Sequence, residues 1–166
     1  MIMRYMNASL YKNKDGEESN YVVSNIFRLS DTETHLQGED KAIFSGLHNH
    51  WMLWHGTDKK NLMSILMKGL KIKPPNASHS GSLFGDAIYF ADLFSKSLSY
   101  STHNRRRSNN EDNTFYMLLC EVALGNVANY TNNWSIEVYR PPQGYHSVRV
   151  MGEKGPDFAH SIITDQ

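Results

Sequence analysis

The stretch Leu53-Trp54-His55-Gly56-Thr57 indicates the fold of this chain more strongly than any other. Two later segments belong with it, Gly85-Asp86-Ala87-Ile88-Tyr89-Phe90-Ala91-Asp92 and Ser95-Lys96-Ser97-Leu98-Ser99-Tyr100. The compact apolar run over 51–55, closed by a glycine, predicts a buried strand whose carboxyl end opens onto a site. Tyrosines at the edge of a second strand and on a helix would suit a flat ligand with polar edges, held between aromatic rings.

A helix is predicted directly after this strand, near residues 58–68. Thr57 suits the N-cap position, and Asp58 suits the first helical turn, where a negative charge is favourable. Gly69 follows as the residue that ends the helix. One apolar face is formed by side chains at helical spacing, namely Leu62, Ile65 and Leu66.

A short strand is predicted next over 87–90, where apolar and aromatic residues follow one another. A second helix comes after it, capped by Asp92 or Ser95. This helix carries Ser97 and Tyr100. The loop between the two helices, over 73–81, holds paired prolines and small polar residues that oppose both helix and sheet.

The remaining apolar stretches read as strands. Residues 21–29 are rich in β-branched and aromatic side chains, and the longest apolar run, over 114–124, is predicted to be a central strand. Shorter strands are expected near 126–130 and 145–150. Because strands outnumber helices and do not alternate with them, the class predicted is α+β rather than a doubly wound parallel sheet.

Length and charge limit the possible functions. The chain has 166 residues, enough for one domain, which we expect over 20–166 after a flexible polar tail over 1–19. Lys plus Arg equals Asp plus Glu at 17 each, which argues against a broad electrostatic grip on nucleic acid. The basic cluster Arg105-Arg106-Arg107 is interpreted first as a solvated loop, with phosphate contact as the alternative. Cys120 is the single cysteine of the sequence, so an intrachain disulfide is excluded.

The His-Gly pair at the end of the first strand suggests amide recognition. A glycine backbone can pair with both the donor and the acceptor side of a carboxamide, since no side chain blocks the approach. A nearby tyrosine can stack on an aromatic ring, so the set would suit nicotinamide. Each residue alone also has a structural explanation, His55 as a satisfied polar group and Tyr89 as a core side chain.

Several motifs in a fixed order resemble the poly(ADP-ribose) polymerase catalytic domain, closest to its DNA-damage-dependent members. The resemblance implies an ADP-ribosyltransferase fold, with split and bent β-sheets, a few helices and NAD in a central cleft, here lacking the last strands. Besides the three stretches quoted first, the motifs are Leu47-His48-Asn49, 69–75, Glu121-Val122-Ala123-Leu124-Gly125-Asn126, Gly144-Tyr145-His146-Ser147-Val148 and Pro156-Asp157.

The resemblance also assigns roles to single residues. It implies that His55 hydrogen-bonds the adenosine ribose and that the Gly56 backbone holds the nicotinamide carboxamide. Tyr100 is expected to stack on the nicotinamide, with Tyr89 on the other side of the pocket. Ser97 is expected to donate to the carboxamide oxygen.

By the same resemblance, further residues are expected to lie along the length of the NAD molecule. Thr57 and Asn61 are expected along it, with Ser64 near the adenosine end. Lys71 stands where the family usually has an arginine facing the pyrophosphate, and 74–85 corresponds to a loop that closes over NAD. The candidate catalytic residues by this resemblance are His55, Tyr89 and Lys96.

The implied activity is transfer of ADP-ribose from NAD to a protein, mono or poly, with release of nicotinamide. The family carries a catalytic glutamate on a strand after the Pro-Asp segment, and the residues up to Gln166 contain none there. Glu137 precedes the Gly144-Tyr145-His146 motif, in the wrong order to replace it, and Glu121 is expected to be structural. The alternative function is therefore a catalytically inactive NAD- or ADP-ribose-binding module.

The expected partners are NAD as substrate and the protein acceptors of ADP-ribose, with no metal, no membrane and no direct nucleic-acid contact. The N-terminus lacks a sustained apolar segment, and no apolar run approaches membrane-spanning length. The expected location is intracellular, nuclear or cytoplasmic. The resemblance adds DNA repair as the expected process.

Overall fold

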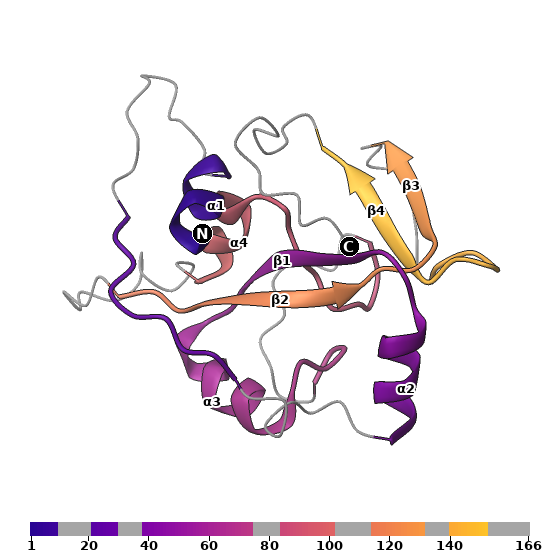
Figure 1. Ribbon diagram of the computed structural model, residues 1–166, viewed down its shortest axis with the longest axis horizontal. Helices are drawn as coiled ribbons and strands as arrows, with labels where there is room; N and C mark the ends of the chain where they lie inside the picture. The colour runs from indigo at the N-terminus through magenta and orange to yellow at the C-terminus, as the bar shows by residue number, and fades with distance from the viewer. Residues whose placement is uncertain (10–20, 30–37, 75–83, 102–113, 132–139, 153–166) are drawn as a thin grey trace.

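The computed structural model describes residues 1–9, 21–29, 38–74, 84–101, 114–131 and 140–152 (Figure 1). Four helices and four strands lie in these ranges, which confirms the α+β class. The elements in chain order are α1 (Ile2–Ala8), α2 (Gly38–Gly46), β1 (His50–Gly56), α3 (Lys59–Lys68), α4 (Phe94–Ser101), β2 (Met117–Ala123), β3 (Val127–Thr131) and β4 (Ser147–Met151).

The centre of the fold is the antiparallel ladder of β1 and β2. Leu53 pairs with Cys120 at its middle, and Gly56 pairs with Met117 at its end. Leu53 and Trp54 point to opposite faces of the strand and both are buried. In the view of Figure 1, α1 and α4 lie on one side of this ladder and α3 on the other. The predicted buried strand over 51–55 is thus confirmed.

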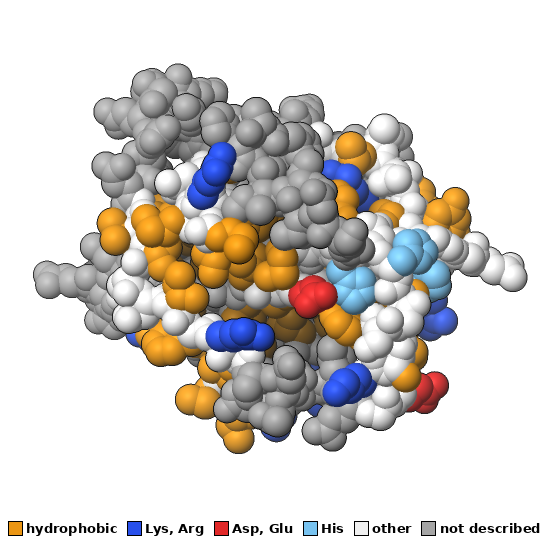
Figure 2. Space-filling view, in the orientation of Figure 1, with side chains coloured by type: hydrophobic (Ala, Val, Ile, Leu, Met, Phe, Trp, Pro, Cys, Tyr) orange, Lys and Arg blue, Asp and Glu red, His pale blue; other side chains and the backbone are white. Residues whose placement is uncertain are grey.

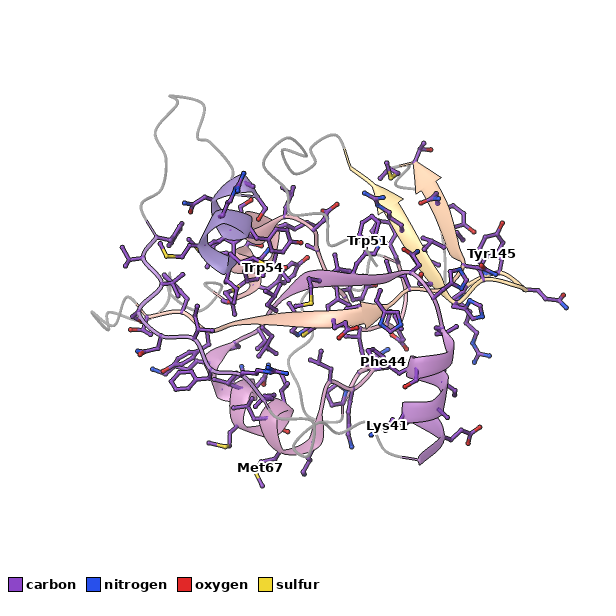
Figure 3. All side chains as sticks on the ribbon, in the orientation of Figure 1. Lys41, Phe44, Trp51, Trp54, Met67 and Tyr145 are labelled. Carbon is purple, nitrogen blue, oxygen red and sulfur yellow. The ribbon has the colours of Figure 1, made fainter. Side chains whose placement is uncertain are left out.

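A hydrophobic cluster forms where α1 and α4 meet β1, around Trp54 (Figure 3). The Trp54 ring stacks on Tyr5, with 5.4 Å between ring centroids, and meets the edge of Phe94 at 5.1 Å. The Tyr5 hydroxyl donates to the carbonyl of Met52 at 2.6 Å. The buried members of the cluster are Met6, Trp54, Phe94 and Leu98.

The helix predicted near 58–68 is α3, and its start differs by one residue from the prediction. Asp58 is the N-cap, since its carboxylate accepts the Lys60 amide at 3.0 Å. The Thr57 hydroxyl instead accepts a hydrogen bond from the Asn61 amide group at 3.3 Å. A carboxylate satisfies the helix amide and also complements the positive end of the helix dipole, which favours Asp58.

Three stretches differ from their predicted local structure. Residues 2–8, expected in a flexible tail over 1–19, form α1, because Met6 packs into the Trp54 cluster. Residues 21–29 have strand-like composition but form no strand, and their side chains are mostly exposed. Residues 87–90 form no strand either. The pairing of this segment with β1 is a single bridge between Ala91 and Trp54.

The last two strands form a separate sheet, in which β3 and β4 run parallel. The turn over 124–126 joins this sheet to β2. Gly125 has a φ of +54°, and a Cβ there would lie 2.5 Å from Nδ1 of His146, so the turn requires glycine. Within the described ranges β2 pairs with β1 alone, so the central position predicted from its apolar run is not seen among these residues.

Candidate functional site

His55 lies at the carboxyl end of β1, against the segment over 84–92. Its Nδ1 is 2.8 Å from the carbonyl oxygen of Tyr89, and the imidazole packs against Phe90 with 5.7 Å between ring centroids. A carbonyl oxygen can only accept, so Nδ1 carries the proton. Nε2 has no hydrogen-bond partner among the described residues. The ring therefore presents Nε2 as an acceptor for a ligand.

The charge state of His55 follows from its burial. Burial lowers the pKa of this imidazole below its ordinary value of 6.5, and the hydrogen bond to the Tyr89 carbonyl offsets only part of that effect. The ring is therefore neutral at physiological pH. A neutral imidazole with Nδ1 protonated has a lone pair on Nε2 that can accept a hydroxyl proton.

Gly56, the next residue, lets helix α4 come into direct contact with β1. A Cβ at this position would lie 1.6 Å from the backbone oxygen of Ser97 and 2.5 Å from its carbonyl carbon. Only a residue without a side chain allows this approach. The glycine thus fixes how close the helix that carries Ser97 and Tyr100 lies to the end of β1.

The Ser97 side chain also links α4 to β1. Its hydroxyl donates to the carbonyl oxygen of Trp54 at 2.9 Å, and only 3% of the residue is exposed. The Trp54 carbonyl also accepts the Ala91 amide at 2.9 Å. The single Ser97 proton is therefore used within the protein, which differs from the donation to a ligand that the resemblance implies.

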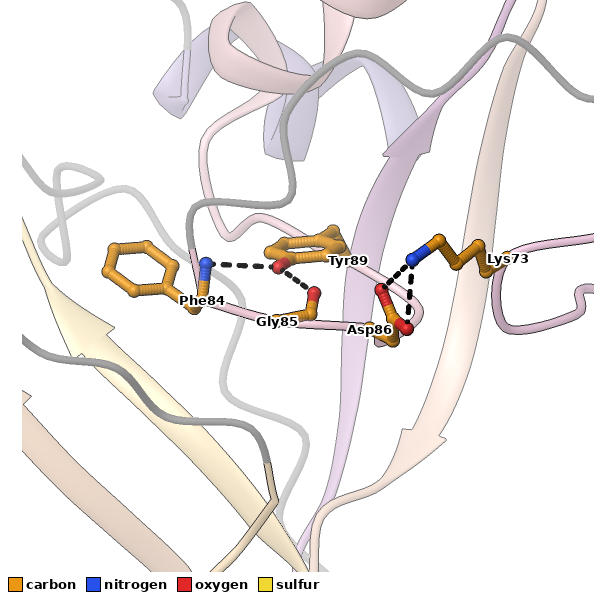
Figure 4. A network of polar contacts seen from close by, with 5 residues as sticks. All are labelled: Lys73, Phe84, Gly85, Asp86 and Tyr89. Carbon is orange, nitrogen blue, oxygen red and sulfur yellow. Dashed lines mark hydrogen bonds and ion pairs between the residues drawn. The ribbon is translucent and has the colours of Figure 1, made fainter.

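Tyr89 is held by its own segment (Figure 4). Its hydroxyl donates to the Gly85 carbonyl at 2.6 Å and accepts the Phe84 amide at 3.2 Å. Lys73, just beyond α3, forms an ion pair with Asp86 at 2.9 Å, which ties the same segment to the chain after α3. These contacts fix the Tyr89 ring while leaving it partly exposed.

Tyr89 and Tyr100 lie close enough to interact electrostatically. Burial is the main cause that raises the pKa of Tyr89, and the nearby Tyr100 adds to it. The two residues are 37% and 40% exposed. Both rings therefore have surface available for stacking on a ligand.

The other candidate residues lie at the start of α3 and further along the chain. Thr57 and Asn61 are joined by the hydrogen bond between their side chains, one turn apart. Ser64 follows on the next turn and is exposed. The side chains of Ser64, Lys71 and Lys96 are exposed and form no hydrogen bond or ion pair within the described ranges.

Contacts that the sequence did not reveal surround the site. Arg149 of β4 forms an ion pair with Asp92, with 3.3 Å between Nη2 and Oδ2, and its guanidinium lies over the Trp51 ring. No spacing signal links these residues, because they come from three distant parts of the chain. Glu121 pairs with His50 at 2.8 Å, which confirms the expectation that it is structural.

Three features singled out in the sequence lie outside the described residues. These are Glu137, the cluster Arg105-Arg106-Arg107 and most of the loop 74–85. Within the described residues, no group of three or more His, Cys, Asp or Glu side chains could hold a metal ion. In the same part of the chain, no helix has the length and apolar character needed to cross a bilayer.

Comparison with known proteins places the chain in a family. The model of the poly(ADP-ribose) polymerase catalytic domain matches residues 1–166. Poly [ADP-ribose] polymerase 1 of Caenorhabditis elegans is 43% identical over 108 residues, 65% of this chain. Poly [ADP-ribose] polymerase 1 of Gallus gallus is 39% identical over 81% of the chain, and poly [ADP-ribose] polymerase 2 of Homo sapiens is 39% identical over 78%.

These relatives are much longer than the matched region. The alignments span 11%, 12% and 21% of the three relatives, respectively. The match therefore concerns one domain of each relative. Because the family model matches residues 1–166, this chain belongs to the poly(ADP-ribose) polymerase catalytic domain family.

Proposed function

We propose that this chain is an NAD-dependent ADP-ribosyltransferase that moves ADP-ribose from NAD to a protein acceptor and releases nicotinamide. The observation that carries the proposal is the arrangement around His55 in a chain of this family. A neutral imidazole presents an open Nε2 beside the segment that carries Tyr89. Family membership supplies the reaction type, and this geometry supplies a binding surface that suits the substrate.

His55 would act by binding rather than by moving a proton. Its Nε2 would accept a hydrogen bond from a ribose hydroxyl of NAD, while Nδ1 stays on the Tyr89 carbonyl. Because that bond fixes the ring, the acceptor is oriented before the substrate arrives. The Gly56 backbone, held in place by α4 packed against it, would give the carboxamide a rigid partner.

The two tyrosines would hold the nicotinamide ring. Tyr89 is fixed through its hydroxyl, and Tyr100 lies near it on α4, with both rings partly exposed. Cleavage of the bond between ribose and nicotinamide builds positive charge on the ribose, as in other glycosyl transfers. Electron-rich ring faces near that carbon favour this charge over the ground state.

The rest of the dinucleotide would follow α3. Thr57, just before α3, and Asn61, in its first turn, offer a linked pair of polar groups, and exposed Ser64 stands one turn further. Lys71 would attract the pyrophosphate as a single positive charge, without the forked contact that an arginine makes. Lys96 lies between the buried residues Phe94 and Ser97 of α4, as an exposed cation on the same element as Tyr100.

The test uses labelled NAD with the wild-type chain and two matched variants. The wild type is expected to transfer label from the adenosine half of NAD to protein, and NAD is expected to raise its melting temperature. His55→Gln should lose both effects. His50→Gln, five residues earlier on the same strand, should keep both.

The outcomes separate the proposal from its alternative. If NAD raises the melting temperature but no label reaches protein, the chain is an NAD-binding module and the transferase proposal is wrong. If neither effect is seen with the wild type, both functions are excluded. If His50→Gln loses as much as His55→Gln, the assignment of the site to the carboxyl end of β1 is wrong.

A further inference from the structure

Arg149 joins the β3–β4 sheet to the segment that carries Tyr89. It lies in β4, opposite Asn129 of β3. Its Nη2 is 3.3 Å from Oδ2 of Asp92, and the two side chains are 32% and 31% exposed. On its other side, the guanidinium carbon is 5.0 Å from the centroid of the Trp51 ring. One side chain thus contacts β1 and the segment over 84–92 together.

Both of its partners are themselves fixed. The indole of Trp51 donates to the Asn49 side chain at 2.7 Å, and Asn49 in turn donates to the Gly125 carbonyl at 3.2 Å. Asp92 directly follows Ala91, which exchanges two backbone hydrogen bonds with Trp54 at 2.8 and 2.9 Å. Arg149 therefore ends a chain of contacts that begins at the turn between β2 and β3.

The segment over 84–92 carries the contacts of the proposed site. Tyr89 gives its carbonyl to His55, and the bridge at Ala91 follows two residues later. Asp92 comes next, two residues before α4 begins at Phe94. An anchor at Asp92 therefore restrains both the direction of the segment and the approach of the helix that bears Tyr100.

We propose that Arg149 is a positioning residue for the NAD site, and this inference rests on the proposed function. It touches neither His55 nor Tyr89 by hydrogen bond or ion pair in the described residues. It acts by holding the Asp92 carboxylate and the Trp51 ring in one place, so that the Tyr89 segment keeps its position on β1.

The chemistry of the contact favours arginine over lysine. A planar guanidinium can stack flat on an indole while its N–H groups bind a carboxylate at the edge. A lysine ammonium keeps the charge but not both contacts at once. Without any cation, Asp92 is left partly buried with no opposite charge paired to it, and its negative charge already adds to burial in raising the pKa of Tyr5.

The first arm of the test measures positioning without NAD. Hydrogen exchange at the Ala91 and Trp54 amides is followed in wild type, Arg149→Met and Arg149→Lys, with Arg140→Met as control because Arg140 is an exposed arginine. Arg149→Met should speed exchange at both amides about 10-fold, Arg149→Lys less, and the control not at all. Unchanged exchange in Arg149→Met overturns the inference, whether or not the chain is a transferase.

The second arm measures NAD. Arg149→Met should raise the KM for NAD about 10-fold with less than about a 3-fold change in kcat, since the residue orients the site and does not touch reacting atoms. The double variant Arg149→Asp with Asp92→Arg restores the opposite charges and should recover part of the lost amide protection and affinity. Equal losses in kcat and kcat/KM would contradict positioning. A wild type without transfer refutes the proposed function, while the exchange arm still decides the role of Arg149.

Discussion

The two ends of β1 carry the same residue type in opposite states. At the start, His50 places Nδ1 2.8 Å from the Glu121 carboxylate and Nε2 2.8 Å from the Leu47 carbonyl. Both partners are acceptors, so the doubly protonated ring satisfies both. At the end, His55 has one nitrogen on a carbonyl and the other open. The first histidine has both ring nitrogens paired within the protein, and the second has one ring nitrogen without a partner among the described residues.

The pKa values of the two histidines move in opposite directions. The hydrogen bond to Glu121, followed by that to Leu47, raises the pKa of His50 above its ordinary value. Burial lowers the pKa of His55. In Figure 2, histidine side chains gather over the end of β2 nearest the turn to β3, which is the end that pairs with the start of β1.

The two tryptophans of the strand repeat this contrast. The Trp51 indole donates to Asn49 at 2.7 Å. The Trp54 indole nitrogen is buried and has no hydrogen-bond partner in the described part of the chain. The unpaired indole nitrogen of Trp54 and the open imidazole nitrogen of His55 thus lie near the carboxyl end of β1, whereas the His50 and Trp51 side chains near its start are paired. Such imperfections are expected where a protein binds or reacts.

The largest effect is expected at Gly56, the last residue of β1. Gly56→Ala places a Cβ 1.6 Å from a backbone oxygen of α4, so the helix must move away. This overpacking should lower the free energy of unfolding by about 3 kcal/mol or more. Denaturant unfolding measures the change.

Gly46, the last residue of α2, is the matched control, because a Cβ there meets nothing within 4 Å. Gly46→Ala should change the stability by less than about 1 kcal/mol. Equal losses in both variants would mean that the close approach of α4 is not specific to the end of β1.

The next largest effect concerns NAD binding. His55→Gln removes an oriented acceptor and should weaken NAD binding by about 1–3 kcal/mol, the range for a buried hydrogen-bond partner left unpaired. His50→Gln should leave NAD affinity unchanged, since His50 bonds only Glu121 and Leu47. Calorimetric titration with NAD compares the two. A similar loss in both would remove the functional difference between the ends.

A smaller difference is expected between the stability changes caused by substituting the two tryptophans. Trp54→Phe removes a buried N–H without a partner, which offsets the lost ring area, so the stability should change by less than about 1 kcal/mol. Trp51→Phe loses the bond to Asn49 and part of the stack under Arg149, and should cost about 1–2 kcal/mol. Thermal unfolding followed by circular dichroism ranks the pair, and the reverse order would contradict the contrast.

The smallest effect is the pH dependence of stability. His50 has a raised pKa when folded, so its contribution is full below about pH 6.5, its unfolded value, and is lost as the pH rises through the folded pKa. His55 has a lowered pKa, so stability is lost as the pH falls below about 6.5, because the unfolded chain binds the proton more readily.

Unfolding curves from pH 5 to pH 8 with both glutamine variants test this. His50→Gln should be less stable than wild type at low pH and equal to it at high pH. His55→Gln should show a weaker loss of stability on acidification than wild type. Proton NMR titration of the two imidazoles should place His50 above His55, and the reverse order would refute the assignment.

Much of the fold follows from local patterns. The apolar run ending at Gly56 and the helix after it were predictable because each is governed by its own residues, through periodicity and capping. The turn at Gly125 was equally local. The segment over 21–29 has strand composition, yet a strand also needs a partner, and none of the described segments pairs with it. Composition alone cannot supply that partner.

The candidate site was predictable in its residues rather than in its contacts. Family motifs indicated His55 and the tyrosines, and the structure brings His55 and Tyr89 together. The Ser97 hydroxyl donates to the Trp54 carbonyl because α4 lies close to β1. No sequence pattern reveals how close these two elements lie. Arg149, Asp92 and Trp51 meet only through the fold, so their link has no sequence signal.

Cys120 gives this architecture a built-in reporter. It pairs with Leu53 at the centre of the β1–β2 ladder, and burial raises the pKa of its thiol to about 11. Alkylating reagents attack the thiolate, so the folded chain should react about 100-fold more slowly than an ordinary cysteine at the same pH. Labelling would then be limited by opening of the ladder, and its rate would measure how often the strand bearing both histidines separates from its neighbour.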